Sequence, residues 1–398
     1  MSVRILFVDA AVDVLADLRR ALSPQRDGWE MHFVPSASAA WRILEVEPFD
    51  VVVADLSVPG VDGVPFLSEV RQRYPEAARL VLSDHTSGEG LMPAVLTAHQ
   101  FLAKPFESED VIAAVERSLR LRAEIDQDWL RADVAGLDAL PSPRAVLYEL
   151  LAVLDSPRST ARDVAAVVER DVGLATKVLQ LVNSSFFAPR SRITSLDRAI
   201  AHLGIGTVRS VVLSDEVMRT FRMPGGDLGA WLTRVNAHAL QTATLARRLA
   251  APEDRDDAFC AGLLHECGQL VFAACRPGLF LAHLTLRARE GRPLVDIERE
   301  SFGVTHAEAG ARLLSLWGFR GGVVDAVEAH CHPPAVGSAG PGQAATAVAV
   351  AHRLVEAEVM RLCTAPDDPG LSDAWLDGVG LLRPVQDWRA STRVATAS

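Results

Sequence analysis

Four polar residues stand at the ends of short apolar runs in the first third of the chain, where they could share one pocket. They are Asp9, Asp55, Ser83 and Lys104. Paired carboxylates can hold a hard cation such as Mg²⁺, which prefers oxygen ligands. An ammonium and a hydroxyl can contact phosphoryl oxygens, and an aspartate can act as a covalent nucleophile. The set could therefore hold a cation and bind a phosphate group close to Asp55.

A second set of chemically capable residues lies in the last two thirds, which carry eight of the eleven histidines. These are His202, His238, His265, His283, His306, His330, His332 and His352. A lone histidine is more often a satisfied core or surface residue than a ligand, but several on helices of one bundle can converge on a metal. His265 and Glu266 are adjacent, yet position 269 is Gln, so the zinc-protease signature H-E-x-x-H is excluded.

The elements that must position the first set alternate in type. Apolar runs at 4–8, 30–34, 50–54, 79–82 and 100–103 alternate with amphipathic stretches such as 12–22, 36–45 and 108–121. Continuous apolar strands between helices are typical of a parallel sheet covered on both faces. We predict a doubly wound, flavodoxin-like α/β domain with a five-stranded parallel sheet, whose strand ends meet at one edge.

The rest of the chain has helical periodicity and no persistent strand pattern. We predict helices at 144–154, 160–170, 173–183, 196–203, 207–221, 229–250, 256–274, 278–290, 293–302, 306–317, 321–330 and 343–362. The resulting organisation is an α/β domain over 1–122, a connector helix over 123–136, an all-α domain over 137–362 and a tail over 363–398. The tail is rich in Pro and Gly, so we predict that it is irregular.

The first domain resembles the receiver domains of two-component response regulators over residues 3–121. The segments that carry the resemblance are ILFVDA, DVVVADLSVPGVDG, LVLS and FLAKPF. The resemblance implies that Asp55 is the phospho-acceptor and Lys104 the pocket lysine. It also implies that Ser83 is the switch hydroxyl, that Phe101 changes rotamer with it, and that Pro105 follows a cis peptide bond.

The magnesium site is where this chain departs from the receiver pattern. The resemblance implies that Asp9, Asp55 and Ser57 hold the ion. Receivers usually carry two adjacent acids after the first strand, whereas Ala10 follows Asp9 here. Loss of one carboxylate should weaken Mg²⁺ binding and phosphorylation, and Asp13 is expected to point elsewhere. A receiver that takes no phosphate and serves only in docking is the open alternative.

The all-α region resembles HDOD domains over residues 137–332. The carriers are LPSPRAVLYELLAVL, VAAVVERDVGLATKVLQLVNSSFF, ITSLDRAIAHLGIGTVRSVVLS, AGLLHECGQLV and THAEAGARLLSLWGF. HDOD domains are relatives of the HD metal-dependent phosphohydrolases and are usually regarded as lacking that catalysis.

Several residues fall near HD ligand positions by this resemblance: His238, His265, Glu266, His306, His330 and His352. Glu266 stands where an Asp is expected, Cys331 where a second His often follows, and His352 where the last helix usually has an Asp. We therefore expect a vestigial site without metal. One bound divalent ion without turnover and a working phosphohydrolase remain the alternatives.

Composition limits the other possibilities. The net charge of −11 argues against a nucleic-acid surface, which needs a basic face. No stretch reaches the roughly 18 uncharged apolar residues that a membrane span requires, so we expect a cytoplasmic protein without membrane contact. The five cysteines form no CxxC pair, and an odd number favours reduced thiols.

Together these patterns predict a response regulator in a phosphorelay. A sensor histidine kinase or phosphotransfer protein would phosphorylate Asp55, and a non-catalytic HDOD surface would act on a downstream protein that the sequence does not name. The resemblance also implies a homodimer formed through the fourth and fifth helical faces of the receiver. The alternatives are an HD-type phosphohydrolase acting on a nucleotide or cyclic dinucleotide, and a scaffold that works without phosphorylation.

Overall fold

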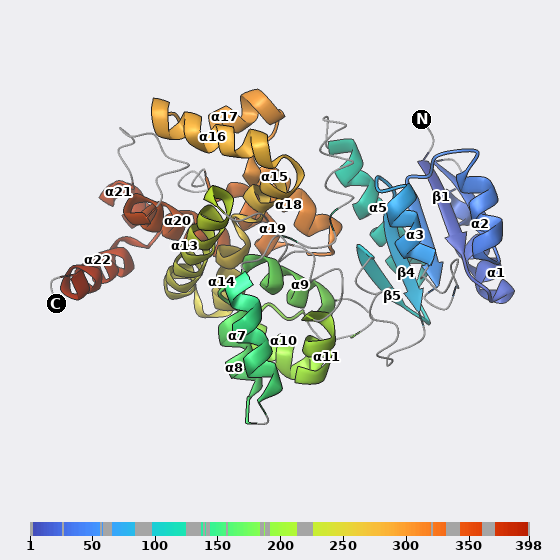
Figure 1. Ribbon diagram of the computed structural model, residues 1–398, viewed down its shortest axis with the longest axis horizontal. Helices are drawn as coiled ribbons and strands as arrows, with labels where there is room; N and C mark the ends of the chain where they lie inside the picture. Colours follow the sequence, from blue (N-terminus) through green and yellow to red (C-terminus); the bar gives the residue numbers. More distant parts are fainter. Residues whose placement is uncertain are drawn as a thin grey trace.

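A computed structural model of the chain shows an α/β domain beside an all-α domain, as predicted (Figure 1). It describes residues 3–25, 28–55, 58, 66–83, 98–124, 137, 140, 144–156, 158–183, 187, 192–212, 226–319, 321–331, 343–359 and 371–396. The C-terminal helix projects from the side of the all-α domain that is far from the receiver.

The first domain is a parallel five-stranded sheet in the order β2-β1-β3-β4-β5. Its strands are β1 (Val3–Val8), β2 (Trp29–Val34), β3 (Val51–Asp55), β4 (Ala78–Ser83) and β5 (Gln100–Ala103). Each begins and ends within one residue of its predicted range. The described helices around the sheet are α1 (Val12–Ala21), α2 (Ala37–Leu44), α3 (Phe66–Arg73) and α5 (Ser108–Glu124).

The register of the central strands places the predicted pocket residues at one edge of the sheet. β3 is buried along its whole length, as expected for a strand covered on both faces. Val8 of β1 pairs with Ala54 of β3, so Asp9 and Asp55 leave neighbouring strands at the same level. Ala103 ends β5, and Lys104 follows it at the same edge.

The second domain is helical throughout its described length. Its helices are α7 (Arg144–Asp155), α8 (Ala161–Val168), α9 (Val172–Val182), α10 (Leu196–Leu203), α11 (Ile205–Val212), α13 (Asp227–Leu249), α14 (Arg255–Leu264), α15 (Cys267–Cys275), α16 (Pro277–Glu290), α17 (Leu294–Phe302), α18 (His306–Leu316), α19 (Gly322–Ala329) and α20 (Ala344–Val359). Helices α13, α14, α19 and α20 pack on one another and form the centre of this bundle.

The predicted helix 256–274 is wrong, because the chain turns at His265 and Glu266 between α14 and α15. Glu266 has φ −92° and ψ 7°, outside the helical range. The turn lets α15 lie against α18, where a Cβ on Gly268 would come within 1.8 Å of the His306 carbonyl oxygen. The apolar pattern continues across this turn, so periodicity alone gives no sign of it.

The prediction of an irregular tail is also wrong. Residues 373–378 and 382–396 form α21 (Asp373–Gly378) and α22 (Leu382–Thr396), and α22 packs against α13. Leu376 and Val385 are fully buried. Gly380 lies between the two helices with φ 72°, and Pro384 lies in the first turn of α22, where no intrahelical N–H bond is lost.

Helix α5 reaches Glu124 and so enters the predicted connector, whose residues 125–136 lie outside the described chain. Residues 213–221 of the predicted helix 207–221 lie outside it as well. Within the described chain, one segment, Pro252–Cys275, is long and apolar enough to cross a membrane, but 89% of its apolar window is buried inside the bundle.

The two domains meet where α5 of the receiver packs against α18 of the helical bundle. Gln180 on α9 donates a hydrogen bond of 3.3 Å to the backbone oxygen of His99, next to β5, and both residues are buried. Gly318, after α18, faces the side chain of Gln100. The predicted homodimer would use a receiver face that includes α5, and α18 already covers part of that helix.

Candidate functional sites

The receiver pocket brings together three of the residues predicted from the sequence. Lys104 Nζ lies 2.5 Å from Asp9 Oδ2 and 2.5 Å from Asp55 Oδ2. Both carboxylates are buried. The backbone N–H of Ala11 donates to Asp9 Oδ1 at 2.9 Å, which fixes the orientation of that carboxylate.

The pocket has more acidic than basic side chains, which favours binding of a cation. Burial opposes the charge on Lys104, but hydrogen bonds from its ammonium to Asp55 and Asp9 outweigh burial and raise its pKa above the ordinary value. One lysine thus faces two carboxylates. The two carboxylates offer the oxygen ligands that Mg²⁺ prefers. Ala10 is exposed and its side chain adds no oxygen. Asp13 is exposed in the first turn of α1.

The remaining predicted receiver residues are described only in part. Ser57 lies outside the described residues, while Ser83 and Phe101 lie in β4 and β5 with side chains that are not described. The peptide bond before Pro105 is cis, as the resemblance implied.

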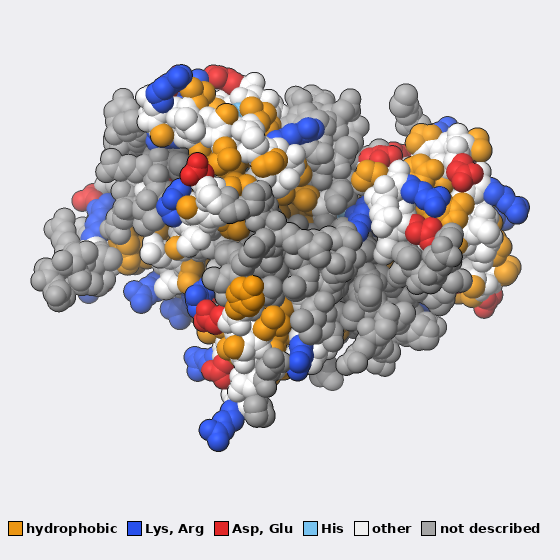
Figure 2. All heavy atoms as spheres, in the orientation of Figure 1, with side chains coloured by type: hydrophobic (Ala, Val, Ile, Leu, Met, Phe, Trp, Pro, Cys, Tyr) orange, Lys and Arg blue, Asp and Glu red, His pale blue; other side chains and the backbone are white. Residues whose placement is uncertain are grey.

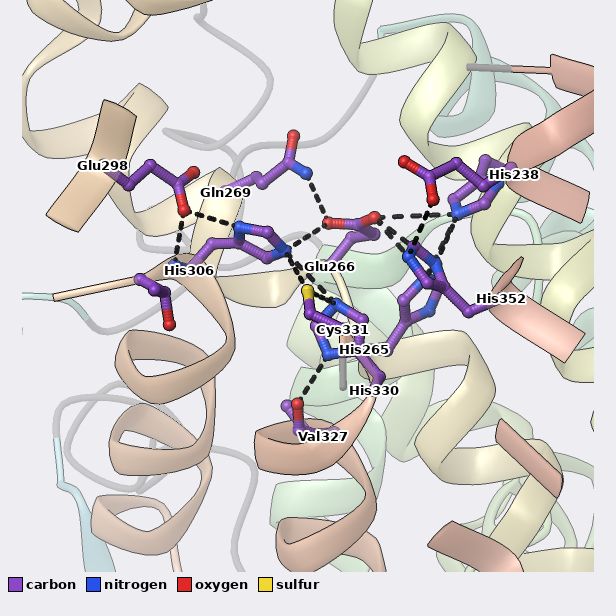
Figure 3. Close-up of polar contacts among 12 residues, drawn as sticks. His238, His265, Glu266, Gln269, Glu298, His306, Val327, His330, Cys331 and His352 are labelled. Atoms are coloured by element: carbon purple, nitrogen blue, oxygen red, sulfur yellow. Dashed lines mark hydrogen bonds and ion pairs between the residues drawn. The ribbon is translucent and has the colours of Figure 1, made fainter. Parts of the chain in front are cut away.

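Three buried histidines of the second domain point their ring nitrogens at one another, and we name them the three-histidine site (Figure 3). They are His238 on α13, His265 at the end of α14 and His352 on α20. The Nε2 atoms of His238 and His265 are 3.2 Å apart, and each is 3.0 to 3.1 Å from His352 Nδ1. The sequence separation of 114 residues shows that only the tertiary fold joins them.

A second group, named the cysteine site, lies beside the first. It consists of His306 at the start of α18, His330 after α19 and Cys331. His306 Nε2 is 3.2 Å from His330 Nε2, and Cys331 Sγ is 3.4 Å and 3.2 Å from these two atoms. His306 and His330 are buried, whereas Cys331 is partly exposed.

Glu266 lies between the two groups, as Figure 3 shows. Its Oε1 is 3.6 Å from His238 Nε2 and 3.5 Å from His265 Nε2. Its Oε2 is 3.5 Å from His306 Nε2 and accepts a hydrogen bond from Gln269 at 2.5 Å. Each carboxylate oxygen therefore faces one site.

Outer partners fix the tautomers of three of these rings. The Nδ1 atoms of His265 and His330 lie 2.6 Å from the backbone oxygens of Gly262 and Val327. A carbonyl only accepts, so each Nδ1 carries the proton and each Nε2 presents a lone pair to the site. Such outer hydrogen bonds are typical of metal-binding histidines.

His306 has the corresponding partner in Glu298, whose Oε2 accepts from Nδ1 at 2.7 Å and from the backbone N–H of His306 at 2.9 Å. Glu298 on α17 is fully buried. Glu298 belongs to no sequence motif, so it is not predicted from the sequence, and only its hydrogen bonds to His306 reveal its role.

The electrostatics of the three-histidine site favour neutral rings. Burial, together with the neighbouring His265, lowers the pKa of His238 to about 3. Burial also lowers the pKa values of His265 and His352. Neutral imidazoles are the form that binds metals.

Burial and neighbouring charges act in opposite directions on Glu266 and His306. Burial alone would raise the pKa of Glu266, but the surrounding histidines, led by His306, hold it well below its ordinary value. Burial likewise opposes the charge on His306, but Glu298, Cys331 and Glu266 raise its pKa well above the ordinary value.

Two other histidines of the domain stand apart from these sites. His202 is exposed and its Nε2 bonds to the backbone oxygen of Phe187. His283 is buried edge-on against Phe302. The six predicted HD-type residues, by contrast, all converge.

Comparison with known families agrees with this division of the chain. Residues 5–116 match the family model of the response regulator receiver domain, and residues 140–333 match that of the HDOD domain. The chain is a receiver domain fused to an HDOD domain. The charged pocket lies within the receiver match, and the histidines of both groups lie within the HDOD match, except His352 on α20.

Individual relatives resemble parts of this receiver–HDOD chain. An uncharacterized protein of Treponema pallidum is 25% identical over 55% of this chain and 43% of its own length. Transcriptional regulatory protein PrrA of Mycobacterium leprae is 30% identical over 42% of this chain and 77% of its own length. The crystal structure of the MmoQ response regulator from Methylococcus capsulatus covers 58% of this chain and 96% of its own, at 23% identity and a TM-score of 0.46.

Proposed function

We propose that this protein is a response regulator that accepts a phosphoryl group on Asp55 and signals through its HDOD domain. The observation that carries the proposal is the contact of Lys104 with both Asp55 and Asp9 at the end of the sheet. A receiver reduced to docking alone has no need of a partly buried lysine between two carboxylates.

In the proposed reaction an oxygen of Asp55 attacks the phosphorus of a phosphohistidine on a sensor kinase or phosphotransfer protein. A P–O bond forms, the P–N bond breaks, and the imidazole leaves with the electron pair. Lys104, now beside a phosphoryl group, offsets part of its negative charge. Mg²⁺ held by Asp9, Asp55 and Ser57 would supply further charge neutralisation, and Ala10 makes this site weaker than that of a receiver with two acids.

The proposed output is an interaction between the HDOD surface and a downstream protein. The contacts of α5 with α18, and of Gln180 with His99, give the receiver a direct route to that domain. We place the protein in the cytoplasm, where its kinase donor is found, and keep a homodimer as a predicted consequence of phosphorylation.

Nucleic-acid binding gains no support from the surface. On the face shown in Figure 2, the Lys and Arg side chains of the described residues stand apart, with acidic side chains among them. A continuous basic stripe would be needed to contact successive phosphates.

A beryllofluoride titration of the full chain in Mg²⁺ tests the proposal, because this anion mimics a phosphoryl group on an aspartate. We expect saturable binding, a change in the protease sensitivity of the α5–α18 contact, and loss of both in Asp55→Asn. Asp13→Asn is the matched control, since Asp13 is an exposed acid near the same pocket. A wild-type response no greater than that of Asp55→Asn would leave the phosphorylation-independent scaffold.

A second candidate function, an HD-type phosphohydrolase, is favoured by the position of Glu266 between His265 and His306, 3.5 Å from a ring nitrogen of each. Hydrolysis of nucleotides and cyclic dinucleotides by purified protein, lost in His265→Ala and kept in His202→Ala, would establish it. The absence of turnover in the metal-loaded protein would leave the HDOD domain as an interaction module.

A further inference from the structure

The receiver and the HDOD domain meet in a polar contact at the beginning of β5. Gln180 Nε2 on α9 donates a hydrogen bond of 3.3 Å to the backbone oxygen of His99. Both residues are buried, with 3% and 1% of their surface exposed. β5 stands at the edge of the described sheet, where a strand has backbone groups free to bond outside the sheet. The HDOD domain therefore binds the receiver at the start of its edge strand.

The side chain of Gln180 is only half satisfied in this contact. Its Nε2 atom donates to His99, whereas its Oε1 atom is buried and has no hydrogen-bond partner among the described residues. A buried acceptor without a partner costs free energy, and it gains a partner when water reaches it. The contact thus combines one hydrogen bond with one unfavourable buried oxygen, so the closed arrangement is only weakly favoured over an open one.

The receiver side of the contact keeps its own hydrogen bonds when the domains separate. Gln100 follows His99 and lies beside Gly318 of the HDOD domain. Its side chain is held by α5, because Arg117 donates to its Oε1 atom at 2.9 and 3.2 Å, and its Nε2 atom donates to Ser118 at 3.3 Å. These bonds lie within the receiver, so opening of the domains leaves them intact.

Strand β5 connects this contact to the phosphorylation pocket. It is four residues long, each of them paired with β4, and a strand of this length spans about 13 Å. His99 precedes the strand and Lys104 follows it. Lys104 contacts both carboxylates of the pocket, so a phosphoryl group on one of them changes its partners. The lysine of the pocket and the carbonyl that Gln180 binds therefore lie at the two ends of one strand.

We propose that Gln180 holds the HDOD domain closed on the receiver until Asp55 is phosphorylated, and we name its contact with His99 the interdomain latch. Movement of Lys104 towards the phosphoryl group displaces β5, the His99 oxygen withdraws from Gln180, and α5 separates from α18. This regulation rests on the proposed function, because it requires a phosphoryl group on Asp55.

The interdomain latch makes a reciprocal prediction about the pocket. If a phosphoryl group favours the open arrangement, then a variant that is already open binds that group more tightly by the same factor. A residue that served only to pack α9 would have no effect on a pocket at the far end of β5. The affinity of the pocket thus separates a regulatory role of Gln180 from a purely structural one.

The experiment compares Gln180→Glu with the wild type, both as full-length chains. The substitution keeps the size of the side chain and replaces the donor amide with a carboxylate that repels the His99 oxygen. Hydrogen exchange of the α5 amides measures opening, and titration with beryllofluoride in Mg²⁺ measures the affinity of the Asp55 pocket. We expect exchange to rise at least about tenfold and beryllofluoride to bind about 5- to 10-fold more tightly. Gln241→Glu adds the same charge at an exposed position of α13 and should change neither.

A second variant guards against a folding defect. Gln180→Ala removes the donor without adding a buried charge, so it should change both measurements in the same direction as Gln180→Glu. Circular dichroism and the thermal midpoint of each variant show whether it folds. Beryllofluoride should raise the exchange of α5 in the wild type and add little in either variant, because their contact is already open.

Two results would overturn the latch. One is an exchange of α5 in both folded Gln180 variants that equals that of the wild type. The other is an unchanged affinity for beryllofluoride in variants whose α5 exchange has risen. A wild type that binds no beryllofluoride would contradict the proposed function and with it the link to Asp55. That result is recognisable, because the exchange of α5 would still rise in Gln180→Glu.

Discussion

The receiver pocket and the histidine groups of the HDOD domain both contain buried carboxylates. They differ in how the negative charge of these carboxylates is balanced. In the receiver, Lys104 supplies a permanent cation between Asp9 and Asp55. In the HDOD domain, Glu266 is surrounded by imidazoles that are cationic only when they take up a proton. The receiver pocket therefore has a cation of its own, whereas the charge around Glu266 depends on how many of the neighbouring imidazoles are protonated.

The two sites also differ in how they are assembled. Strand register places Asp9 and Asp55 side by side, because both follow paired residues of β1 and β3. The histidines come from five separate segments, and their convergence depends on how closely helices cross. Gly268 and Gly310 allow α15 and α18 to touch through their backbones.

The largest expected effect comes from adding a side-chain atom at the point where α15 and α18 touch. In Gly268→Ala the new Cβ would meet the His306 carbonyl oxygen at 1.8 Å, so backbone must move. We expect a loss of about 3–5 kcal/mol in the free energy of unfolding. Gly278→Ala in α16, where nothing lies within 4 Å, should be neutral or slightly stabilising. Urea unfolding measures both, and equal midpoints would show that the crossing is not tight.

Removal of the receiver's own cation should have the next largest effect. Lys104→Ala leaves two buried carboxylates facing each other, and we expect a loss of about 2 kcal/mol. Mg²⁺ should restore more stability to this variant than to the wild type. Arg20→Ala, which breaks an exposed ion pair with Asp17, should cost under about 0.5 kcal/mol. Thermal unfolding with and without Mg²⁺ checks this, and an unaffected Lys104→Ala midpoint would contradict it.

Glu298→Gln should lower the free energy of unfolding by about 1–3 kcal/mol, because an amide is a weaker partner than a carboxylate for the two buried N–H groups of His306. Glu300→Gln on the same helix removes an equally charged but exposed side chain and should cost under about 0.5 kcal/mol. Urea unfolding gives the stability of each variant. Equal midpoints would mean that the charge of Glu298 is not needed.

The smallest effect is expected from adding the second acid that receivers usually carry after the first strand and that this chain lacks. Ala10→Asp adds a carboxylate beside Asp9 and should tighten Mg²⁺ binding about tenfold, since another nearby negative charge attracts the ion. Val12→Asp adds the same charge at an exposed position of α1 and should have a much smaller effect. Isothermal titration distinguishes them, and identical affinities would show that only net charge matters.

The receiver was largely predictable from the sequence, because its chemistry follows from strands that end in polar residues. The positions of Asp55 and Lys104 need no more than the order and register of the parallel strands. The side chains of Ser83 and Phe101 remain predictions, since the described structure does not include them.

The residues of the two histidine groups could be named from the sequence, but their arrangement could not. The resemblance to HD-type proteins pointed to six residues that the structure brings together. That they form a vestigial site, because Glu266 and His352 replace acids of a different length or charge, stays a prediction. The turn at His265 repositions Glu266 so that its two oxygens face different sites. The apolar periodicity continues through that turn and so does not reveal it. In the tail, Gly380 and Pro384 suggest irregular structure, whereas they lie between two helices and in the first turn of the second.

Helix α18 belongs to both halves of the molecule. It begins at His306 in the cysteine site, packs against α5 of the receiver, and spans about 16 Å as a rigid segment. If phosphorylation of Asp55 shifts this helix, it also shifts His306, and thermodynamic linkage requires a reciprocal effect: whatever rearranges the cysteine site changes the stability of the phosphorylated state by the same factor. A regulator built in this way would couple kinase activity to the histidine groups through one helix.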